Sequence, residues 1–311
     1  MNHSPANAER SHPGSHGGRI LVIALHAFTQ LVRMRVFYFL AVFAVIAIGS
    51  NFFDLPQHAG PETAGVNVLH AIKSWSLGTM TLFSVVLAIV ATALLLPKDV
   101  EDRTLYTILA KPVPRLDYLA GKLLGVLLLL VVSLALMDLL LAAVLQIRTS
   151  ILLGQLMDIA NARGWALDEV ASQRAELLTH GPNWSLQGAV VAVFLRAAIM
   201  AALALLISTF SSSTLFTSIT SFLVYFAGHF QADARGVLLD SGAGGHGPVA
   251  RVTGMLVALV LPDFQLFNVI DAVIEGQAMP LILLGQLAAA GLFYVVFYTL
   301  ASWYIFAEKE F

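Results

Sequence analysis

The chain has 311 residues, of which 58% are hydrophobic and 12% are charged, whereas soluble domains carry about a quarter charged residues. This composition excludes an ordinary soluble protein and indicates an integral membrane protein built from apolar spans of about 20 residues each. The formal net charge of −2 argues against a nucleic acid partner. The absence of cysteine excludes disulfides, thiolate metal ligands and cysteine nucleophiles.

The N-terminal region divides into a polar tail and an amphipathic segment. Residues 1–18 are rich in Gly, Ser, Pro and His without periodicity, which predicts a disordered tail. From Arg19 to Arg35, apolar residues recur at helical spacing with basic residues between them, which predicts a helix on the membrane surface. Basic residues beside the first predicted span, Val36 to about Phe53, favour a cytoplasmic N-terminus. We expect no removable signal peptide.

Residues 19–311 are predicted to form one all-α transmembrane domain with six spans and both termini inside. The apolar run Val252–Leu261 is too short to cross about 30 Å of hydrocarbon, so we interpret it as a re-entrant or interfacial helix. In the outer segment Arg148–Ser185 we expect short helices at Leu152–Ala162 and Leu167–Leu178. After the first, the predicted spans are about Ser76–Leu96, Leu123–Ile147, Leu186–Phe210, Thr214–Phe230 and Ala278–Phe306.

A dense run of charges with two prolines interrupts the apolar sequence between the second and third spans. Pro97 is expected to end the second span, and Asp99 with Asp102 suits a new helix start, because acidic side chains favour the positive end of the helix dipole. Pro112 and Pro114 should end this helix near Ala110. The pattern predicts a short amphipathic helix on the cytoplasmic side, and the alternative is a solvated loop whose charges only fix the topology.

The sequence EDRTLYTILAKPVPRLDYLAGKLLG, residues 101–125, resembles the loop between the first two helix pairs of type 2 ABC transporter (ABC-2) permeases. The resemblance is strongest to the branch associated with multicopper enzyme maturation. In that family an acidic residue and Arg-Thr open a coupling helix, and Lys-Pro, an Arg and Gly-Lys follow before the next span. The matching residues here are Glu101, Arg103, Thr104, Lys111, Pro112, Arg115, Gly121 and Lys122.

The resemblance implies a permease subunit of an exporter in a bacterial-type inner membrane. The subunit would pair with a second copy or a homologous permease and carry separate ATPase subunits, which bind ATP and Mg²⁺, on its cytoplasmic face. This chain has no G-x-x-x-x-G-K-[ST] loop, so we do not expect it to bind ATP itself. The residues expected to couple it to the ATPase are Asp99, Glu101, Asp102, Arg103, Thr104, Tyr106, Lys111, Pro112, Arg115 and Lys122.

Two charged residues, Asp138 and Arg196, fall inside predicted spans, where each costs about 3 kcal/mol on insertion scales. Counted from Lys122, Asp138 lies about 24 Å up its span, and counted from Phe210, Arg196 lies about 21 Å up its own. The similar depth predicts an ion pair. The alternative is that each residue separately lines a watery cavity or extends to the interface.

Other functional classes receive less support from the sequence. The histidines lie in the tail or are scattered over outer segments without ligand spacing, so no metal site is predicted. No G-x-S-x-G or H-E-x-x-H motif is present, and Ser211 to Ser213 are expected to cap helix ends, so no enzyme is predicted. Gly121 and Gly125 could seat a neighbouring helix closely, with chance as the alternative. A non-transporting membrane anchor or assembly scaffold remains a second functional hypothesis.

Overall fold

The computed structural model describes residues 16–52, 64–101, 114–211, 213–239 and 261–308. Within these residues all regular structure is helical, which confirms the all-α class. The α-helices are α1 (His16–Val32), α2 (Arg35–Gly49), α3 (Ala64–Glu101), α5 (Arg115–Arg163), α6 (Leu167–His180), α7 (Trp184–Phe210), α8 (Thr214–Leu239), α10 (Ile270–Ile274) and α11 (Leu281–Glu308), with 3-10 helices η1 (Ser50–Phe52) and η2 (Gln265–Phe267).

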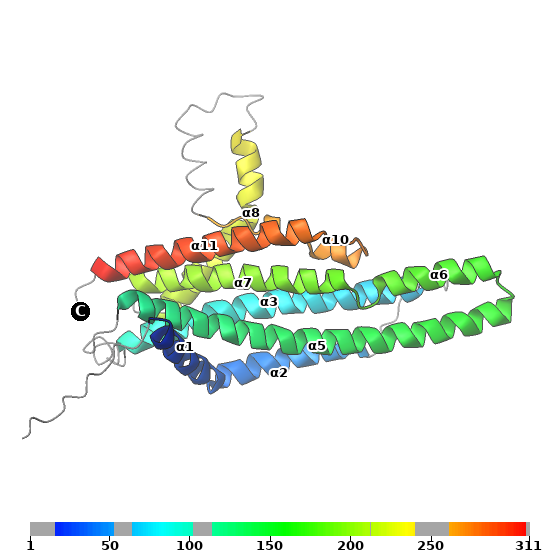
Figure 1. The fold of residues 1–311 in the computed structure, drawn as a ribbon, viewed down its shortest axis with the longest axis horizontal. Coiled ribbons are helices and arrows are strands. Elements are labelled where there is room, and N and C mark those ends of the chain that lie inside the picture. Colours follow the sequence, from blue (N-terminus) through cyan, green and yellow to red (C-terminus); the bar gives the residue numbers. More distant parts are fainter. Residues whose placement is uncertain (1–15, 53–63, 102–113, 212, 240–260, 309–311) are drawn as a thin grey trace, which may run out of the picture.

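The bundle consists of α2, α3, α5, α7 and α11, which run side by side along the long axis of the molecule (Figure 1). One end, here named the Arg115 end, carries the start of α5, the end of α11 and the crossing helix α1. The opposite end, named the α6 end, carries the turn between α5 and α6. Helix α8 packs on α3 and α7 and then projects away from the bundle.

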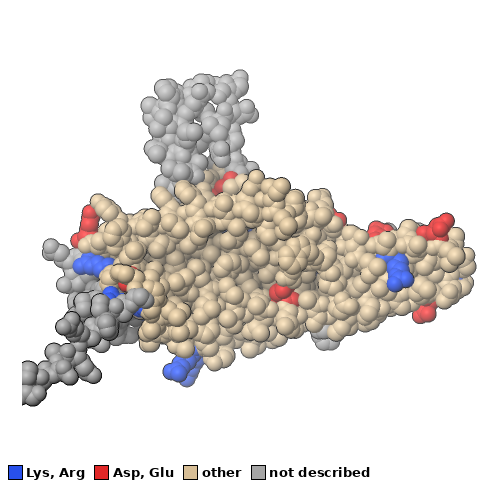
Figure 2. Space-filling view, in the orientation of Figure 1, with Lys and Arg blue, Asp and Glu red and all other residues tan. Residues whose placement is uncertain are grey.

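Four segments of the described chain are long and apolar enough to cross a membrane, which supports a polytopic membrane protein. Helix α2 has 15 residues, about 22 Å, and is shorter than the roughly 30 Å of hydrocarbon. The count of six spans therefore stays a prediction. Figure 2 shows charged side chains mainly towards the two ends and a wide, nearly uncharged middle. The four segments are Gly65–Leu95, Arg115–Arg163, Leu167–Phe210 and Leu281–Glu308.

The prediction that a new helix starts at Asp99 was wrong, because helix α3 does not break at Pro97. Helix α3 begins at Ala64, well before the predicted start at Ser76, and continues past Pro97 to Glu101. Proline removes one amide donor, but the four residues after it can still bond to carbonyls that precede or include it. Asp99 and Glu101 therefore lie in the last turn of α3, and not at the start of a separate helix. The rest of the predicted coupling helix lies outside the described residues.

The third span extends much further than predicted. Helix α5 has 49 residues and is about 73 Å long, more than twice the thickness of the hydrocarbon core. The helix predicted at Leu152–Ala162 is its continuation, because polar residues such as Arg148 mark a membrane edge without breaking a helix. Helix α5 ends at Gly164, whose φ of 67° is the left-handed C-cap conformation that glycine adopts readily. The second predicted outer helix is confirmed as α6, which packs back along α5.

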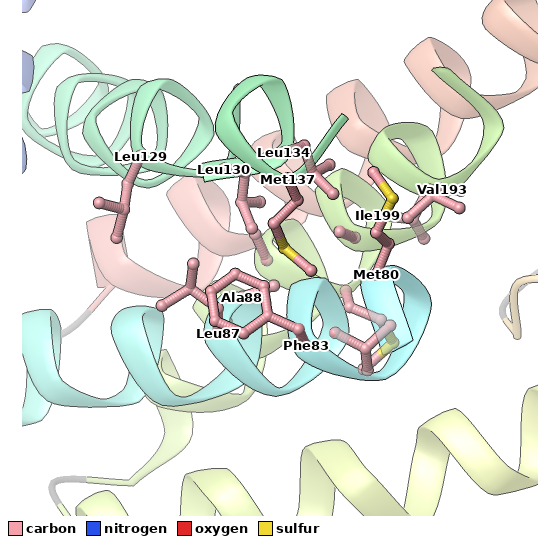
Figure 3. Close-up of a cluster of buried hydrophobic side chains, with 14 of the residues drawn as sticks. Met80, Phe83, Leu87, Ala88, Leu129, Leu130, Leu134, Met137, Val193 and Ile199 are labelled. Atoms are coloured by element: carbon pink, nitrogen blue, oxygen red, sulfur yellow. The ribbon is translucent and has the colours of Figure 1, made fainter. Parts of the chain in front are cut away.

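The core lies between α3, α5 and α7, as the close-up in Figure 3 shows. In a bilayer such packing relies on van der Waals contact, because lipid tails are as apolar as the side chains. Alanines on α7 let its neighbours approach closely, and that helix is buried along most of its length. The labelled core residues, all at most 4% exposed, are Met80, Phe83, Leu87 and Ala88 of α3, Leu129, Leu130, Leu134 and Met137 of α5, and Val193 and Ile199 of α7.

Candidate functional site

Arg115 fastens the start of α5 to the end of α11. Its Nη1 donates hydrogen bonds to the carbonyls of Phe306, at 2.6 Å, and Ala307, at 2.8 Å. The guanidinium carbon also lies 5.9 Å from the centre of the Phe306 ring. A cation at a helix C-terminus satisfies carbonyls that lack intrahelical donors and interacts favourably with the helix dipole. Arg115, predicted as a coupling residue, therefore joins two helices at the Arg115 end.

Lys122 lies inside this junction. Its Nζ is 5.7 Å from the centre of the Tyr118 ring, and that ring stacks on Phe306 with centroids 6.2 Å apart. The Lys122 side chain is only 4% exposed. It is not on a surface that a partner subunit could touch, so a part for Lys122 in coupling would be indirect.

Helix α1 packs closely on the first turns of α5. A Cβ on Gly121 would lie 2.7 Å from the Cβ of Ile23, and one on Gly125 would lie 2.6 Å from the Cβ of Ala27. The prediction that these two glycines seat a neighbouring helix is confirmed, and the neighbour is α1. Nδ1 of His16 adds a contact of 3.0 Å to the Asp117 carboxylate. Helices α1, α5 and α11 thus form one packed junction.

The other predicted coupling residues follow α3 in sequence. Helix α3 ends and α5 begins at the same end of the bundle (Figure 1), so the segment 102–113 connects two helix ends that lie there. Asp99 and Glu101 are in the last turn of α3. Outside the described residues lie Asp102, Arg103, Thr104, Tyr106, Lys111 and Pro112.

The predicted ion pair between Asp138 and Arg196 is not formed. Asp138 on α5 accepts a hydrogen bond of 3.2 Å from Nε2 of Gln187, which lies on α7 near its start. Arg196 donates from Nη2 to the carbonyl of Phe264 at 3.3 Å. Asp138 and Arg196 are not within 4.0 Å of each other.

The two charges were predicted at a similar depth because the position of Asp138 was counted from Lys122. Helix α5 starts at Arg115, not at Lys122, and from there Asp138 is about 35 Å along the helix, while Arg196 is about 21 Å from the end of α7. The two depths differ by about 13 Å. This equals the distance along α7 from Gln187, the partner of Asp138, to Arg196. The two charges therefore lie at different depths.

A cavity of about 430 Å³ lies beside Arg196. Arg196 is near the middle of α7, and the non-helical segment around η2 reaches this depth, although we expected residues 231–277 to lie outside the membrane. Non-helical backbone at membrane depth is tolerated where it is buried in protein or lines a cavity. The predicted re-entrant run Val252–Leu261 lies outside the described residues except for Leu261. The lining residues are Arg196, His229, Phe264, Gln265 and Asn268.

The wall of the cavity is held by contacts between α8 and the η2 segment. The amide of Phe264 donates to the Gly228 carbonyl at 3.3 Å, and a Cβ on Gly228 would lie 2.6 Å from the Phe264 ring. The Phe264 ring centroid is 5.3 Å from that of Tyr225 and 5.7 Å from that of His229. Nε2 of Gln265 donates to the His229 carbonyl at 2.9 Å. Glycine at position 228 therefore permits the close approach that shapes this wall.

A histidine pair at the α6 end was not predicted. Nε2 of His70 and Nδ1 of His180 are 3.0 Å apart, and the glycine Gly276, with φ of 82°, lies against the His180 ring. The two nitrogens can share one proton. Because 110 residues separate the histidines, no local pattern signalled the pair. Among the described residues, no group of three or more His, Cys, Asp or Glu could hold a metal ion.

Comparison with known proteins identifies the family. A family model described as ABC-2 family transporter protein matches residues 21–234, more than half of the chain. The chain belongs to the ABC-2 transporter family. It is therefore a membrane-spanning permease subunit of an ABC transporter, as the resemblance of residues 101–125 implied. The match does not single out the multicopper enzyme maturation branch, and a search of curated proteins finds no match.

The matched range covers the junction and the cavity of this ABC-2 permease only in part. It begins in α1 and ends in α8, so it contains the α1–α5 contact of the junction and the Arg196 side of the cavity, whereas α11 lies beyond it. The η2 segment, which supplies Phe264, Gln265 and Asn268, lies beyond it. The family match therefore does not cover the wall of the cavity that these three residues form.

Proposed function

We propose that this ABC-2 permease is the membrane subunit of an ATP-driven exporter, and that a separate ATPase subunit docks at the Arg115 end. ATP and Mg²⁺ bind to the ATPase subunit, and the substrate path forms between this chain and a second permease. The observation that carries the proposal is the junction of α1, α5 and α11, which directly follows the charged segment that resembles the family's coupling loop.

The junction supplies a means to transmit movement. A partner that displaces the segment 102–113 pulls on the last turn of α3 and the first turn of α5. Because Arg115 holds α11 and the glycines of α5 hold α1, the three helices move together. Helices α3 and α11 both pack on α7, so the movement reaches the helix that carries Arg196. ATP hydrolysis can in this way reshape the cavity.

The proposed transporter has a defined orientation in the membrane and contains a second permease subunit. Both termini lie on the ATPase side of a bacterial-type inner membrane, in keeping with the basic residues at the Arg115 end. A second copy, or a homologous permease, completes the translocation path. On α8, an exposed apolar stripe suits contact with lipid or with that second permease. Its members are Leu215, Phe216, Ile219, Leu223, Phe226 and Phe230.

A proline substitution tests the docking proposal. Thr104→Pro should cost about 3 kcal/mol of helix stability in the predicted coupling helix and abolish stimulation of the ATPase by the permease. The matched control is Ala171→Pro in α6, an exposed position at the opposite end of the molecule. The measurement is ATP hydrolysis by a P-loop ATPase subunit that co-purifies with the co-expressed permease. Full stimulation with Thr104→Pro would rule out docking through this segment, whereas no stimulation by the wild type would favour the membrane-scaffold hypothesis.

A further inference from the structure

We propose that the cavity beside Arg196 binds an anionic group, a carboxylate or a phosphate, carried on an aromatic or apolar body. This inference rests on the proposed transport function and names the chemical class of ligand at one point of the path. The starting observation is Arg196, a buried cation near the middle of α7 that lines a cavity and has no carboxylate within 4.0 Å among the described residues.

The partners of Arg196 within the described chain leave its charge uncompensated. Its side chain is 5% exposed, Nη2 donates to the Phe264 carbonyl, and the guanidinium interacts with the Tyr225 side chain, which is neutral. Its Nε has no hydrogen-bond acceptor in the part of the chain that the structure describes. Buried charges are normally retained where a counter-charge and hydrogen bonds satisfy them. An anion from outside the chain supplies both.

Three acidic residues near this region have other partners among the described residues. The carboxylate of Asp271 accepts Nδ2 of Asn268 at 3.2 Å. The carboxylate of Asp263, one residue before Phe264, accepts the backbone amide of Gln265 at 3.0 Å. The carboxylate of Asp138 accepts Nε2 of Gln187, about 13 Å along α7 from Arg196. None of the three acids lies within 4.0 Å of the guanidinium.

The cavity has the size and lining for more than a small inorganic ion. Its volume of about 430 Å³ falls within the roughly 300–1,000 Å³ of small-molecule sites, whereas one water occupies about 30 Å³. The Arg196 guanidinium can hold a carboxylate or phosphate with two parallel hydrogen bonds. The side-chain amides of Gln265 and Asn268 add polar groups, and the partly exposed ring of His229, packed on the buried ring of Phe264, adds an aromatic surface. The lining therefore matches a molecule with one charged end.

Direct binding to the purified chain tests the proposal without the ATPase. The protein is placed in nanodiscs of zwitterionic phosphatidylcholine, and its thermal unfolding is followed with phenyl phosphate or with the neutral analogue benzyl alcohol. We expect phenyl phosphate, and not benzyl alcohol, to raise the unfolding midpoint of the wild type and of Arg196→Lys. Arg196→Gln should bind phenyl phosphate at least tenfold more weakly. The matched control is Arg174→Gln, an exposed charge on α6, which should bind as the wild type does.

A second substitution keeps the test decisive where Arg196→Gln does not fold. Asn268 is exposed and lines the cavity, and Asn268→Leu removes an amide and narrows the site while Arg196 stays in place. It should weaken phenyl phosphate binding at least fivefold. Equal stabilisation of the wild type, Arg196→Gln and Asn268→Leu by phenyl phosphate would overturn the proposal, as would equal stabilisation by benzyl alcohol.

Lipid composition distinguishes the two sources of such an anion. If the source is a soluble molecule, the phenyl phosphate response persists when anionic phosphatidylglycerol is added to the nanodiscs. If it is a lipid headgroup, phosphatidylglycerol itself raises the midpoint in an Arg196-dependent way and abolishes that response. No response to either anion overturns the proposal. Because no ATPase is present, that outcome would leave the proposed coupling to ATP hydrolysis untouched, and loss of ATPase stimulation would leave the binding result standing.

Discussion

The close contact of α1 with α5 at Gly125 gives a prediction with a definite sign. In Gly125→Ala, the new Cβ would lie 2.6 Å from the Cβ of Ala27 and 2.8 Å from the carbonyl oxygen of Ala24. Because carbon atoms normally approach to about 3.5–4.0 Å, the helices must separate by about 1 Å. Backbone cannot yield by a rotamer change, so the cost lies in the upper part of the about 1–3 kcal/mol range for overpacking.

The expected change in the free energy of unfolding combines two effects. Replacing glycine by alanine inside a helix favours folding by about 0.5–1 kcal/mol. For Gly125→Ala the overpacking exceeds this gain, which leaves a net loss of about 1–2 kcal/mol. The matched control is Gly154→Ala on the same helix, where a Cβ would meet nothing within 4 Å and only the gain remains.

Unfolding of the detergent-solubilised protein by increasing sodium dodecyl sulfate measures both variants. The midpoint should fall for Gly125→Ala and rise slightly for Gly154→Ala. In the double variant Gly125→Ala with Ala27→Gly, part of the clash disappears, so its loss should be smaller than the sum of the two single losses. A Gly125→Ala variant stabilised as much as Gly154→Ala would refute the packing of α1 on α5.

Three further predictions concern the junction, the contact of Asp138 with Gln187, and the topology. Arg115→Gln should lower the free energy of unfolding by about 1–2 kcal/mol in the same assay, because the α11 carbonyls lose charged hydrogen bonds. An unchanged midpoint would contradict the contact between Arg115 and α11. Asp138→Asn and Gln187→Leu should show non-additive losses in a double-mutant cycle, and purely additive losses would mean that the pair is not formed. Single cysteines replacing Leu167, at the α6 end, and Glu308, at the Arg115 end, should report topology, because the chain has no other cysteine. An impermeant thiol reagent should label only the first in intact cells, and labelling at Glu308 would place the C-terminus outside.

The sequence predicted the middle of most helices well and their ends poorly. Apolar periodicity reports which residues face lipid or protein, so the cores of α7 and α11 were placed nearly as the structure has them. Polarity, in contrast, reports where the membrane ends and not where the helix ends. Helix α5 therefore continues through Arg148 to Arg163, and α3 continues through Pro97.

The candidate site was predicted in part, for a similar reason. The cost of an intramembrane charge pointed to Arg196, and small-residue spacing pointed to Gly121 and Gly125. The acceptor of Arg196 is the backbone carbonyl of Phe264, which carries no side-chain signal and comes from a non-helical segment. The depth of Asp138 also depended on where α5 begins, a point that composition does not reveal.

The central claim is that this ABC-2 permease is driven by a separate ATPase, and co-reconstitution tests it most directly. The measurement is the rate of ATP hydrolysis by the ATPase subunit in proteoliposomes, with and without the permease, together with ATP binding by the permease alone. We predict that the permease alone binds no ATP and that its presence raises the rate of hydrolysis by the ATPase several-fold. An ATPase rate that is the same with and without the permease, or ATP hydrolysis by the permease alone, would contradict the claim.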